Sequence, residues 1–212
     1  MVDTAENANA DDKLLIPFSM ITGKLYEENV WKLCEFIRAE RAAALEQLFV
    51  VFISNQNRTV PLWKQKSGRR DQPVIWDYHV ILLQARHPSD ALIYDLDSEL
   101  SFPCTLKLYA DQAFRSDCNI RPEYHRKLRV VPANSFLLNF ATDRSHMRNS
   151  DGSWKMPPPP YPPMNTAECQ MNLDDFISMD PAVGWGVVFS LDHFLIASLL
   201  PSAVNVKMFC NK

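Results

Sequence analysis

Two apolar runs separated by a short polar connection constrain the fold of this chain more than any other feature. Residues 74–85 (VIWDYHVILLQA) and 91–97 (ALIYDLD) are rich in the β-branched and aromatic residues that favour strands. The segment between them, His87-Pro88-Ser89-Asp90, carries residue types typical of a turn. The pattern therefore predicts two neighbouring strands of an antiparallel sheet.

The other predicted elements follow in an order that indicates one α+β domain. A helix is expected from Glu27, because Val30, Cys34 and Ile37 fall on one helical stripe. Further strands are expected at 49–54 and 59–63, with a turn between them at residues 55–57, and at 128–132 and 185–190. Further helices are expected at 135–140, at 173–178 and from residue 191. A leading helix followed by strands at hairpin spacing predicts a single compact α+β domain with a mainly antiparallel sheet.

Composition narrows the class of protein. The chain has 212 residues, 47% of them hydrophobic, which suits one core and therefore one domain. A net charge of -3 and a pI near 5.9 argue against a nucleic-acid binder. The 5 cysteines are widely spaced and include no Cys-x-x-Cys pair, which argues against a disulfide framework and against a zinc site.

Domain limits and location follow from the same pattern. We expect the domain to cover residues 27–200, with a disordered or unrelated segment at 1–26 and a tail at 201–212. The apolar stretch 14–22 is short and follows two aspartates instead of a basic region, so we expect neither a signal peptide nor a membrane span. These features favour a soluble protein of the cytoplasm or the nucleus. The glycine motif at 184–186 does not resemble a phosphate loop, and we expect no cofactor.

The predicted hairpin gathers polar residues on one face. With a turn centred between residues 86 and 89, the partner of His79 lies between residues 93 and 99, and Asp95 falls near the middle of that window. Alternation along the strands places Asp77 and His79 on the face that also carries Asp95 and Asp97. A carboxylate beside an imidazole orients it as a general base. From spacing alone, a solvent-facing strand without function explains the pattern equally well.

Three other features favour structural interpretations. His125 lies in a charged run and is expected on the surface. The sequence Asp143-Arg144-Ser145-His146 suggests a serine triad, but it lacks a nucleophile elbow, and local hydrogen bonds explain it better. The proline run that ends at Pro158-Pro163 predicts polyproline II, either as a strap over the domain or as a ligand for an SH3 or WW domain; we favour the strap.

Six segments resemble one enzyme family. They are Glu27-Glu-Asn-Val-Trp-Lys-Leu-Cys-Glu35, Val51-Phe-Ile-Ser-Asn55, Val74-Ile-Trp-Asp-Tyr-His79, Ile93-Tyr-Asp-Leu-Asp97, Asp143-Arg-Ser-His-Met147 and Met171-Asn-Leu-Asp-Asp-Phe-Ile-Ser-Met179. Between Glu27 and about Phe194 the chain resembles the protein N-terminal glutamine amidohydrolases. The resemblance implies an α/β/α domain like those of papain-like and transglutaminase enzymes. It implies conversion of an N-terminal glutamine to glutamate with release of ammonia, which feeds the N-degron route of protein degradation.

The family resemblance implies a Cys-His-Asp triad, of which this chain carries two members. His79 and Asp95 match the family's histidine and aspartate, but Tyr26 stands where the family has its nucleophilic cysteine. A tyrosine hydroxyl is longer, bulkier and a poorer acyl carrier than a thiolate at a helix N-terminus. Cys34 lies eight residues along the helix, about 12 Å away, and is expected to be a buried hydrophobic residue.

The missing cysteine leaves three hypotheses. The first is an amidohydrolase whose similarity stops at Glu27 because of a wrongly joined first exon or an alternative transcript. The second is an inactive relative that binds N-terminal glutamine or partner proteins. The third is an interaction module acting through the proline run. For the family activity we expect protein or peptide substrates with N-terminal glutamine, a monomer, and recognition of the substrate's α-ammonium by a carboxylate, for which we favour Asp77 over Glu27 and Glu28.

Overall fold

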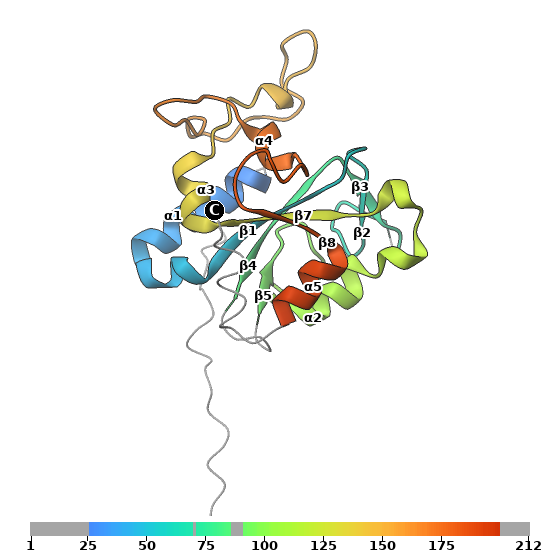
Figure 1. Ribbon diagram of the computed structural model, residues 1–212. Coiled ribbons are helices and arrows are strands. Elements are labelled where there is room, and N and C mark those ends of the chain that lie inside the picture. Colours follow the sequence, from blue (N-terminus) through green and yellow to red (C-terminus); the bar gives the residue numbers. More distant parts are fainter. Residues whose placement is uncertain (1–25, 70, 86–90, 200–212) are drawn as a thin grey trace, which may run out of the picture.

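The computed structural model describes residues 26–69, 71–85 and 91–199 (Figure 1). The strands are β1 (Leu48–Ser54), β2 (Val60–Leu62), β3 (Val74–Trp76), β4 (His79–Gln84), β5 (Leu92–Tyr94), β6 (Cys104–Thr105), β7 (Lys127–Pro132) and β8 (Val187–Ser190). The α-helices are α1 (Tyr26–Glu40), α2 (Leu106–Tyr109), α3 (Ala133–Asn139), α4 (Leu173–Ile177) and α5 (Leu191–Leu199). Shorter helical turns are η2 (Ala42–Gln47), η3 (Ala110–Phe114), η4 (Asp117–Asn119), η5 (Pro122–Tyr124) and η6 (Ser145–Met147). No helix within these ranges is long and apolar enough to cross a membrane.

One six-stranded sheet organises the domain. Its strand order is β6-β5-β4-β1-β7-β8, and each of the five neighbouring pairs is antiparallel. The predicted α+β class with a mainly antiparallel sheet is therefore confirmed. Strand β1 lies in the middle of the sheet and is buried along its whole length, which agrees with its unbroken apolar sequence LFVVFIS.

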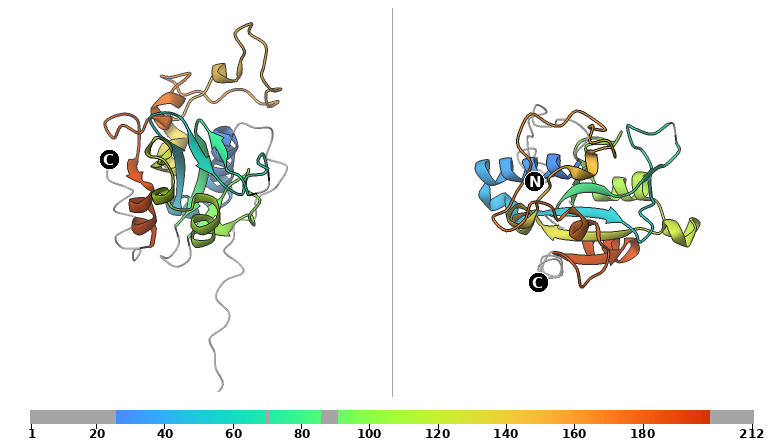
Figure 2. Two further views of the ribbon diagram at one scale, coloured as in Figure 1. Left: turned by 90° about the vertical axis from the view of Figure 1, so that its right-hand side faces the viewer. Right: turned by 90° about the horizontal axis from the view of Figure 1, so that it is seen from above.

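Helices cover both faces of this sheet, so that the domain has three layers. Viewed from above, α1 lies on one side of the sheet and α5 on the other (Figure 2). Alternate side chains of β1 and β4 supply the two cores. Phe52 and Val80 pack with the helices α1, α3 and α4, whereas Ile53 and Ile81 pack with α2 and α5. The α/β/α arrangement implied by the family resemblance is thus present.

The structure corrects three details of the predicted elements. The run 74–85 is not one strand, because β3 ends at Trp76 and β4 begins at His79. Strand β2 does not return along β1 after the turn at residues 55–57; it pairs with β3 in a separate two-stranded sheet. The elements η2, β6 and α2 were not predicted. The turn expected at residues 87–90 lies outside the described residues.

The loop at residues 143–163 runs along the same end of the domain as α4 (Figure 1). Arg144 holds its proline-rich part, because its guanidinium donates to the carbonyl oxygens of Tyr161 (3.0 Å) and Pro162 (3.4 Å). The loop then returns to the domain through a bridge between Thr142 and Met164. These contacts support the interpretation of the proline run as a strap. Binding to another domain stays a prediction.

The glycines of the 184–186 motif have a structural role. Gly184 and Gly186 both have positive φ angles (68° and 78°), and a Cβ atom on either would lie 2.2 Å from a backbone oxygen. This close approach requires glycine. It allows Trp185, between them, to stack on Phe176 with ring centroids 4.8 Å apart. The motif therefore fixes the entry into β8.

Candidate active site

His79 and Asp95 form a buried pair at one end of the sheet. His79 is the first residue of β4, where it pairs with Ile53 of β1, and Asp95 follows the last residue of β5. The imidazole Nε2 lies 2.9 Å from the Asp95 Oδ1 atom. The two residues are only 0% and 4% exposed. The predicted hydrogen bond between them is confirmed, and the alternative of a solvent-facing strand is wrong.

The register of the hairpin explains this contact. Leu82 pairs with Tyr94, so the same register continued by one residue sets Asp95 opposite Ile81. His79 lies two residues before Ile81 and therefore on the same face. The contact is diagonal instead of directly cross-strand, a spacing that longer side chains can bridge.

Asp95 is surrounded by hydrogen-bond donors. Its Oδ2 atom accepts hydrogen bonds from the Tyr109 hydroxyl (2.7 Å) and the Gln65 amide (3.1 Å), and its Oδ1 atom also accepts from the backbone N–H of Asp97 (3.0 Å). Burial raises the pKa of Asp95, but His79, Tyr109 and Gln65 together outweigh it and hold the pKa below its ordinary value. The carboxylate is therefore ionised at neutral pH and suited to orient and stabilise an imidazolium.

The His79 ring is fixed from a second direction. Trp76, at the end of β3, stacks on it with ring centroids 5.1 Å apart and planes 27° from parallel. Because Nε2 faces Asp95, the ring nitrogen that can exchange a proton with a nucleophile is Nδ1. The pair can therefore act as a general base, provided that a nucleophile stands on the Nδ1 side.

The N-terminus of α1 lies beside the beginning of β4. The Tyr78 hydroxyl donates to the Glu27 Oε2 atom at 3.2 Å, which connects the residue before His79 with the residue after Tyr26. Tyr26 is the first residue of α1. Position 26 thus occupies a helix N-terminus, where a thiolate is stabilised by the helix dipole. Its role as the nucleophile position stays a prediction.

Two buried cysteines, Cys34 and Cys104, are poorly suited to act as a nucleophile. Cys34 is 0% exposed and burial raises its pKa far above the ordinary value, as expected for a core residue. Cys104 lies nearer to the pair, but burial and the negative charge of Asp95 raise its pKa to about 11. Both effects oppose formation of the thiolate.

The segment expected to form local hydrogen bonds does so only in part. Asp143 accepts from the backbone N–H of Ser145 at 2.8 Å, as predicted. Arg144 instead makes a two-point ion pair with Glu28 of α1 (2.7 and 2.8 Å), and Glu28 raises its pKa. The φ angle of Arg144 is 62°, a region that non-glycine residues rarely adopt. This buried ion pair therefore ties the loop to the first turn of α1.

Asp77 differs from the other acidic residues of the predicted polar face. It lies in the break between β3 and β4 and is exposed, and its carboxylate accepts from the backbone N–H of Tyr78 at 3.0 Å. Asp97 is buried, and it accepts from the Ser67 hydroxyl at 2.7 Å. The continuous strand on which the choice of Asp77 rested is therefore absent. Its proposed part in substrate binding stays a prediction.

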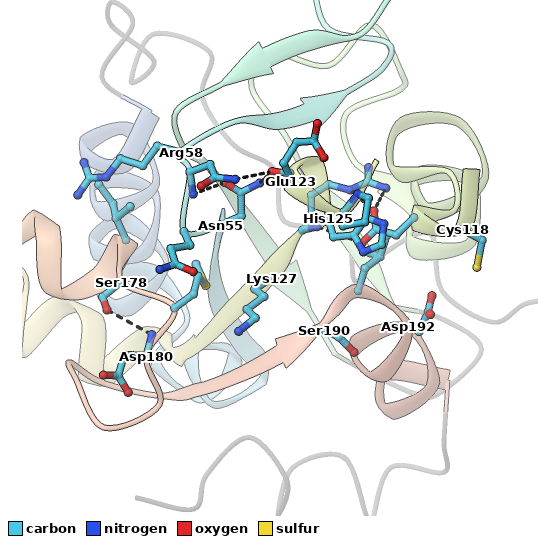
Figure 3. A pocket seen from close by; sticks show the side chains of 18 of the residues that line it. Asn55, Arg58, Cys118, Glu123, His125, Lys127, Ser178, Asp180, Ser190 and Asp192 are labelled. Carbon is cyan, nitrogen blue, oxygen red and sulfur yellow. Dashed lines mark hydrogen bonds and ion pairs between the residues drawn. The ribbon is translucent and has the colours of Figure 1, made fainter. Parts of the chain in front are cut away.

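The structure also contains an open groove of about 810 Å³, whose lining side chains are drawn in Figure 3. Asn55, Lys127 and Ser190 are among the residues around it, and neither His79 nor Asp95 lines it. His125 borders it as an exposed side chain, which confirms the expected surface position. The groove was not predicted from the sequence.

Several partners of the pair were also missed at the level of sequence. Gln65, Trp76 and Tyr109 surround His79 and Asp95, but they come from separate elements. Only tertiary contacts join them to the pair, so no local spacing indicates their role. The polar pattern of the hairpin and the family resemblance were the signals that pointed to this place.

The chain matches the family model described as N-terminal glutamine amidase over residues 22–197. It is 53% identical over 193 residues to the protein N-terminal glutamine amidohydrolase of Danio rerio, covering 90% of this chain and 96% of that protein. The human protein of the same name is 53% identical over 168 residues, covering 79% of this chain and 82% of that protein. The protein of that name from Drosophila mojavensis is 50% identical over 170 residues, covering 80% and 83%.

The matched range begins upstream of Glu27 and includes Tyr26. The expected limit of the family similarity at Glu27 stays a prediction. The range ends at residue 197, within α5, so it covers the whole six-stranded sheet and the helices on both of its faces. With this coverage and half of the residues shared with relatives, the chain belongs to the N-terminal glutamine amidase family.

Proposed function

We propose that this protein carries the site of a hydrolase of the family type, which converts an N-terminal glutamine of a protein or peptide to glutamate and releases ammonia, and that this reaction requires a cysteine at position 26. The observation that carries the proposal is the buried His79–Asp95 pair, in a chain that shares half of its residues with amidohydrolases of that name. Its substrates are proteins or peptides with an N-terminal glutamine.

In the proposed mechanism His79 transfers protons and Asp95 supports it. A thiolate at position 26 attacks the side-chain amide carbon of the glutamine, and the imidazolium of His79 gives a proton to the departing ammonia. Water then attacks the resulting thioester, with His79 as the general base that takes its proton, and the C–S bond breaks to release glutamate and restore the thiolate. Asp95 keeps the ring oriented through Nε2 and stabilises its cationic form.

With Tyr26 the chain lacks the thiolate that carries out the first step of this reaction. Loss of the nucleophile in a triad enzyme lowers kcat by about 10⁶, which leaves only what binding and the oxyanion donors supply. We therefore propose that the chain with Tyr26 does not turn over N-terminal glutamine but keeps the site that binds it. A binding protein for N-terminal glutamine is the second candidate function, and the ionised, fully bonded Asp95 beside His79 favours retention of that site.

A comparison of three proteins tests the proposal. Ammonia release from a Gln-initiated peptide is measured for the unmodified chain, for Tyr26→Cys, and for a chimera whose residues 1–26 come from a relative. We expect no release from the first and release from at least one of the others, abolished by a further His79→Ala substitution. Turnover by the unmodified chain would contradict the assignment of position 26. Silence from all three would favour the binding protein over the enzyme.

The cellular setting is part of the proposal. Deamidation of N-terminal glutamine supplies glutamate for arginylation, so the protein belongs to the N-degron route. We place it in the cytoplasm and the nucleus as a monomer, in line with cysteines that are free in the described part of the chain. Fractionation and light scattering of the full chain test these two statements.

A further inference from the structure

Glu27 is a buried carboxylate with hydrogen-bonding capacity to spare. It is 1% exposed, and its Oε2 atom accepts from the Tyr78 hydroxyl. Within the described part of the chain, its Oε1 atom has no hydrogen-bond partner. An ionised carboxylate has room for about four hydrogen bonds, and leaving this capacity unused in a buried place costs free energy. Glu27 therefore has room for a further donor.

The basic side chains near Glu27, Arg144 and His146, do not supply that donor. Arg144 is committed elsewhere, since Nε and Nη2 bind Glu28 and Nη1 binds the Tyr161 carbonyl oxygen. His146 Nε2 lies 3.3 Å from the Glu27 Oε1 atom, but the two atoms are not in hydrogen-bond geometry. A cationic donor from a ligand would complete the shell of Glu27.

The position of Glu27 relative to the chemistry suggests which cation that is. It directly follows the nucleophile position, and its partner Tyr78 directly precedes His79. In an N-terminal glutamine, the α-ammonium and the reacting amide are joined by one short side chain. A group that recognises the ammonium must therefore lie close to the nucleophile. Glu27 meets this condition, while the exposed Asp77 carboxylate already binds a backbone N–H.

We propose that the Glu27 carboxylate binds the α-ammonium group of the substrate, with the Tyr78 hydroxyl holding the carboxylate in place. The inference rests on the proposed function and extends it, because it explains how a free N-terminus is distinguished from an internal glutamine. A partly desolvated ion pair of this kind is stronger than one on the surface, since water competes less for both partners. Glu27 is thus a specificity-determining residue.

The proposal is tested by comparing the affinities of two peptides for the unmodified chain and for a Glu27 variant. Because both proteins keep Tyr26, turnover does not interfere. Affinities are measured by titration calorimetry for a Gln-initiated peptide and for its analogue that carries hydrogen in place of the α-amino group. The unmodified chain should bind the amine at least about 10-fold more tightly, in line with a hydrogen bond to a charged group. Glu27→Gln keeps an acceptor for Tyr78 and should reduce this ratio to about 1.

Two control variants make the comparison specific. Glu35→Gln removes a carboxylate from the same helix, where it pairs with Lys32 at the surface, and should leave the ratio unchanged. Glu27→Asp keeps the charge on a shorter side chain and should retain part of the ratio. Thermal unfolding of each variant shows whether it is folded.

Each outcome separates the inference from the proposed function. If folded Glu27→Gln keeps the full preference for the peptide with the α-amino group, Glu27 does not bind the ammonium. Loss of that preference in Asp77→Asn would then assign the ammonium to Asp77. If the amine peptide binds but the unmodified chain shows no preference for it, the inference is also wrong. Neither result affects ammonia release by the cysteine-restored proteins. If the peptides do not bind and the restored proteins release no ammonia, the proposed function fails as well.

Discussion

Two carboxylates near the candidate active site are almost equally buried but differ in their surroundings. Asp95 is 4% exposed and accepts from Tyr109, Gln65 and the backbone of Asp97, besides its contact with His79. Glu27 is 1% exposed, and within the described residues its one hydrogen-bond donor is Tyr78, with the His146 Nε2 atom 3.3 Å from its other oxygen. The two carboxylates are therefore similarly buried. Both oxygens of Asp95 accept hydrogen bonds, whereas one oxygen of Glu27 accepts none from the described residues.

The difference separates a positioning role from a binding role. A carboxylate whose oxygens are occupied by the protein cannot bind a ligand, but it can hold a neighbouring ring in one orientation. A carboxylate with an unused oxygen can accept a ligand at little cost in reorganisation. Asp95 fits the first description and Glu27 the second. The following predictions test this division.

The largest expected effect is on catalysis. In the Tyr26→Cys protein, Asp95→Asn should lower kcat by about 10⁴, the size seen for the same change in a serine-protease triad, because the amide no longer stabilises the imidazolium. KM should change much less. Steady-state assays of ammonia release check both values. A large rise in KM at unchanged kcat would give Asp95 a binding role and contradict the division of roles between Asp95 and Glu27.

The second effect concerns the ion pair next to Glu27. Arg144→Met should leave the Glu28 carboxylate buried without its partner and reduce the free energy of unfolding by about 3–5 kcal/mol. Urea unfolding measures this change. The matched variant Arg58→Met breaks an exposed pair with Asp174 and should cost about 0–1 kcal/mol. Similar losses in both would contradict a structural role for the buried pair.

A smaller loss is expected from one donor to Asp95. Tyr109→Phe keeps the aromatic packing with Phe114 but removes the hydroxyl that donates to Asp95. The free energy of unfolding should fall by about 1.5–3 kcal/mol, the range for a hydrogen bond to a charged group. Gln65 and Asp97 still donate, so the fold should survive. Unchanged stability would show that Asp95 does not depend on its full set of donors.

The smallest effect is a dependence on pH. The pKa of Asp95 is lower in the folded state than its ordinary value, so the ionised form stabilises the fold. This contribution is fully present above about pH 4 and is lost as the pH falls through the folded-state pKa. Unfolding measured from pH 6 to pH 3 should show a steeper loss for the unmodified chain than for Asp95→Asn. Equal slopes would mean that Asp95 does not contribute.

The sequence could predict the two members of the pair but not their setting. Alternation along two strands placed His79 and Asp95 on one face, because that pattern depends only on local geometry. The break at residues 77–78 and the ion pair between Glu28 and Arg144 depend on contacts between distant segments. The largely apolar character of 74–85 hid the break, and no local spacing connects Glu28 with Arg144.

The shorter elements were missed for a similar reason. The stretch at 104–109 forms β6 and α2, which are too short to produce a periodic pattern. Tyr109 therefore gave no sign that it would reach Asp95. Partners of this kind are determined by how the layers pack, and one sequence does not reveal that packing.

The central claim is that position 26 stands beside His79 as the nucleophile position. Its most direct test is the rate of alkylation of Tyr26→Cys by iodoacetamide as a function of pH, followed at each cysteine by mass spectrometry. If position 26 lies beside His79, this thiol should react well below its ordinary pKa of about 8.5, and His79→Gln should abolish the advantage. The exposed Cys118 serves as the internal reference. A cysteine at position 26 that reacts like Cys118, with or without His79, would contradict the account.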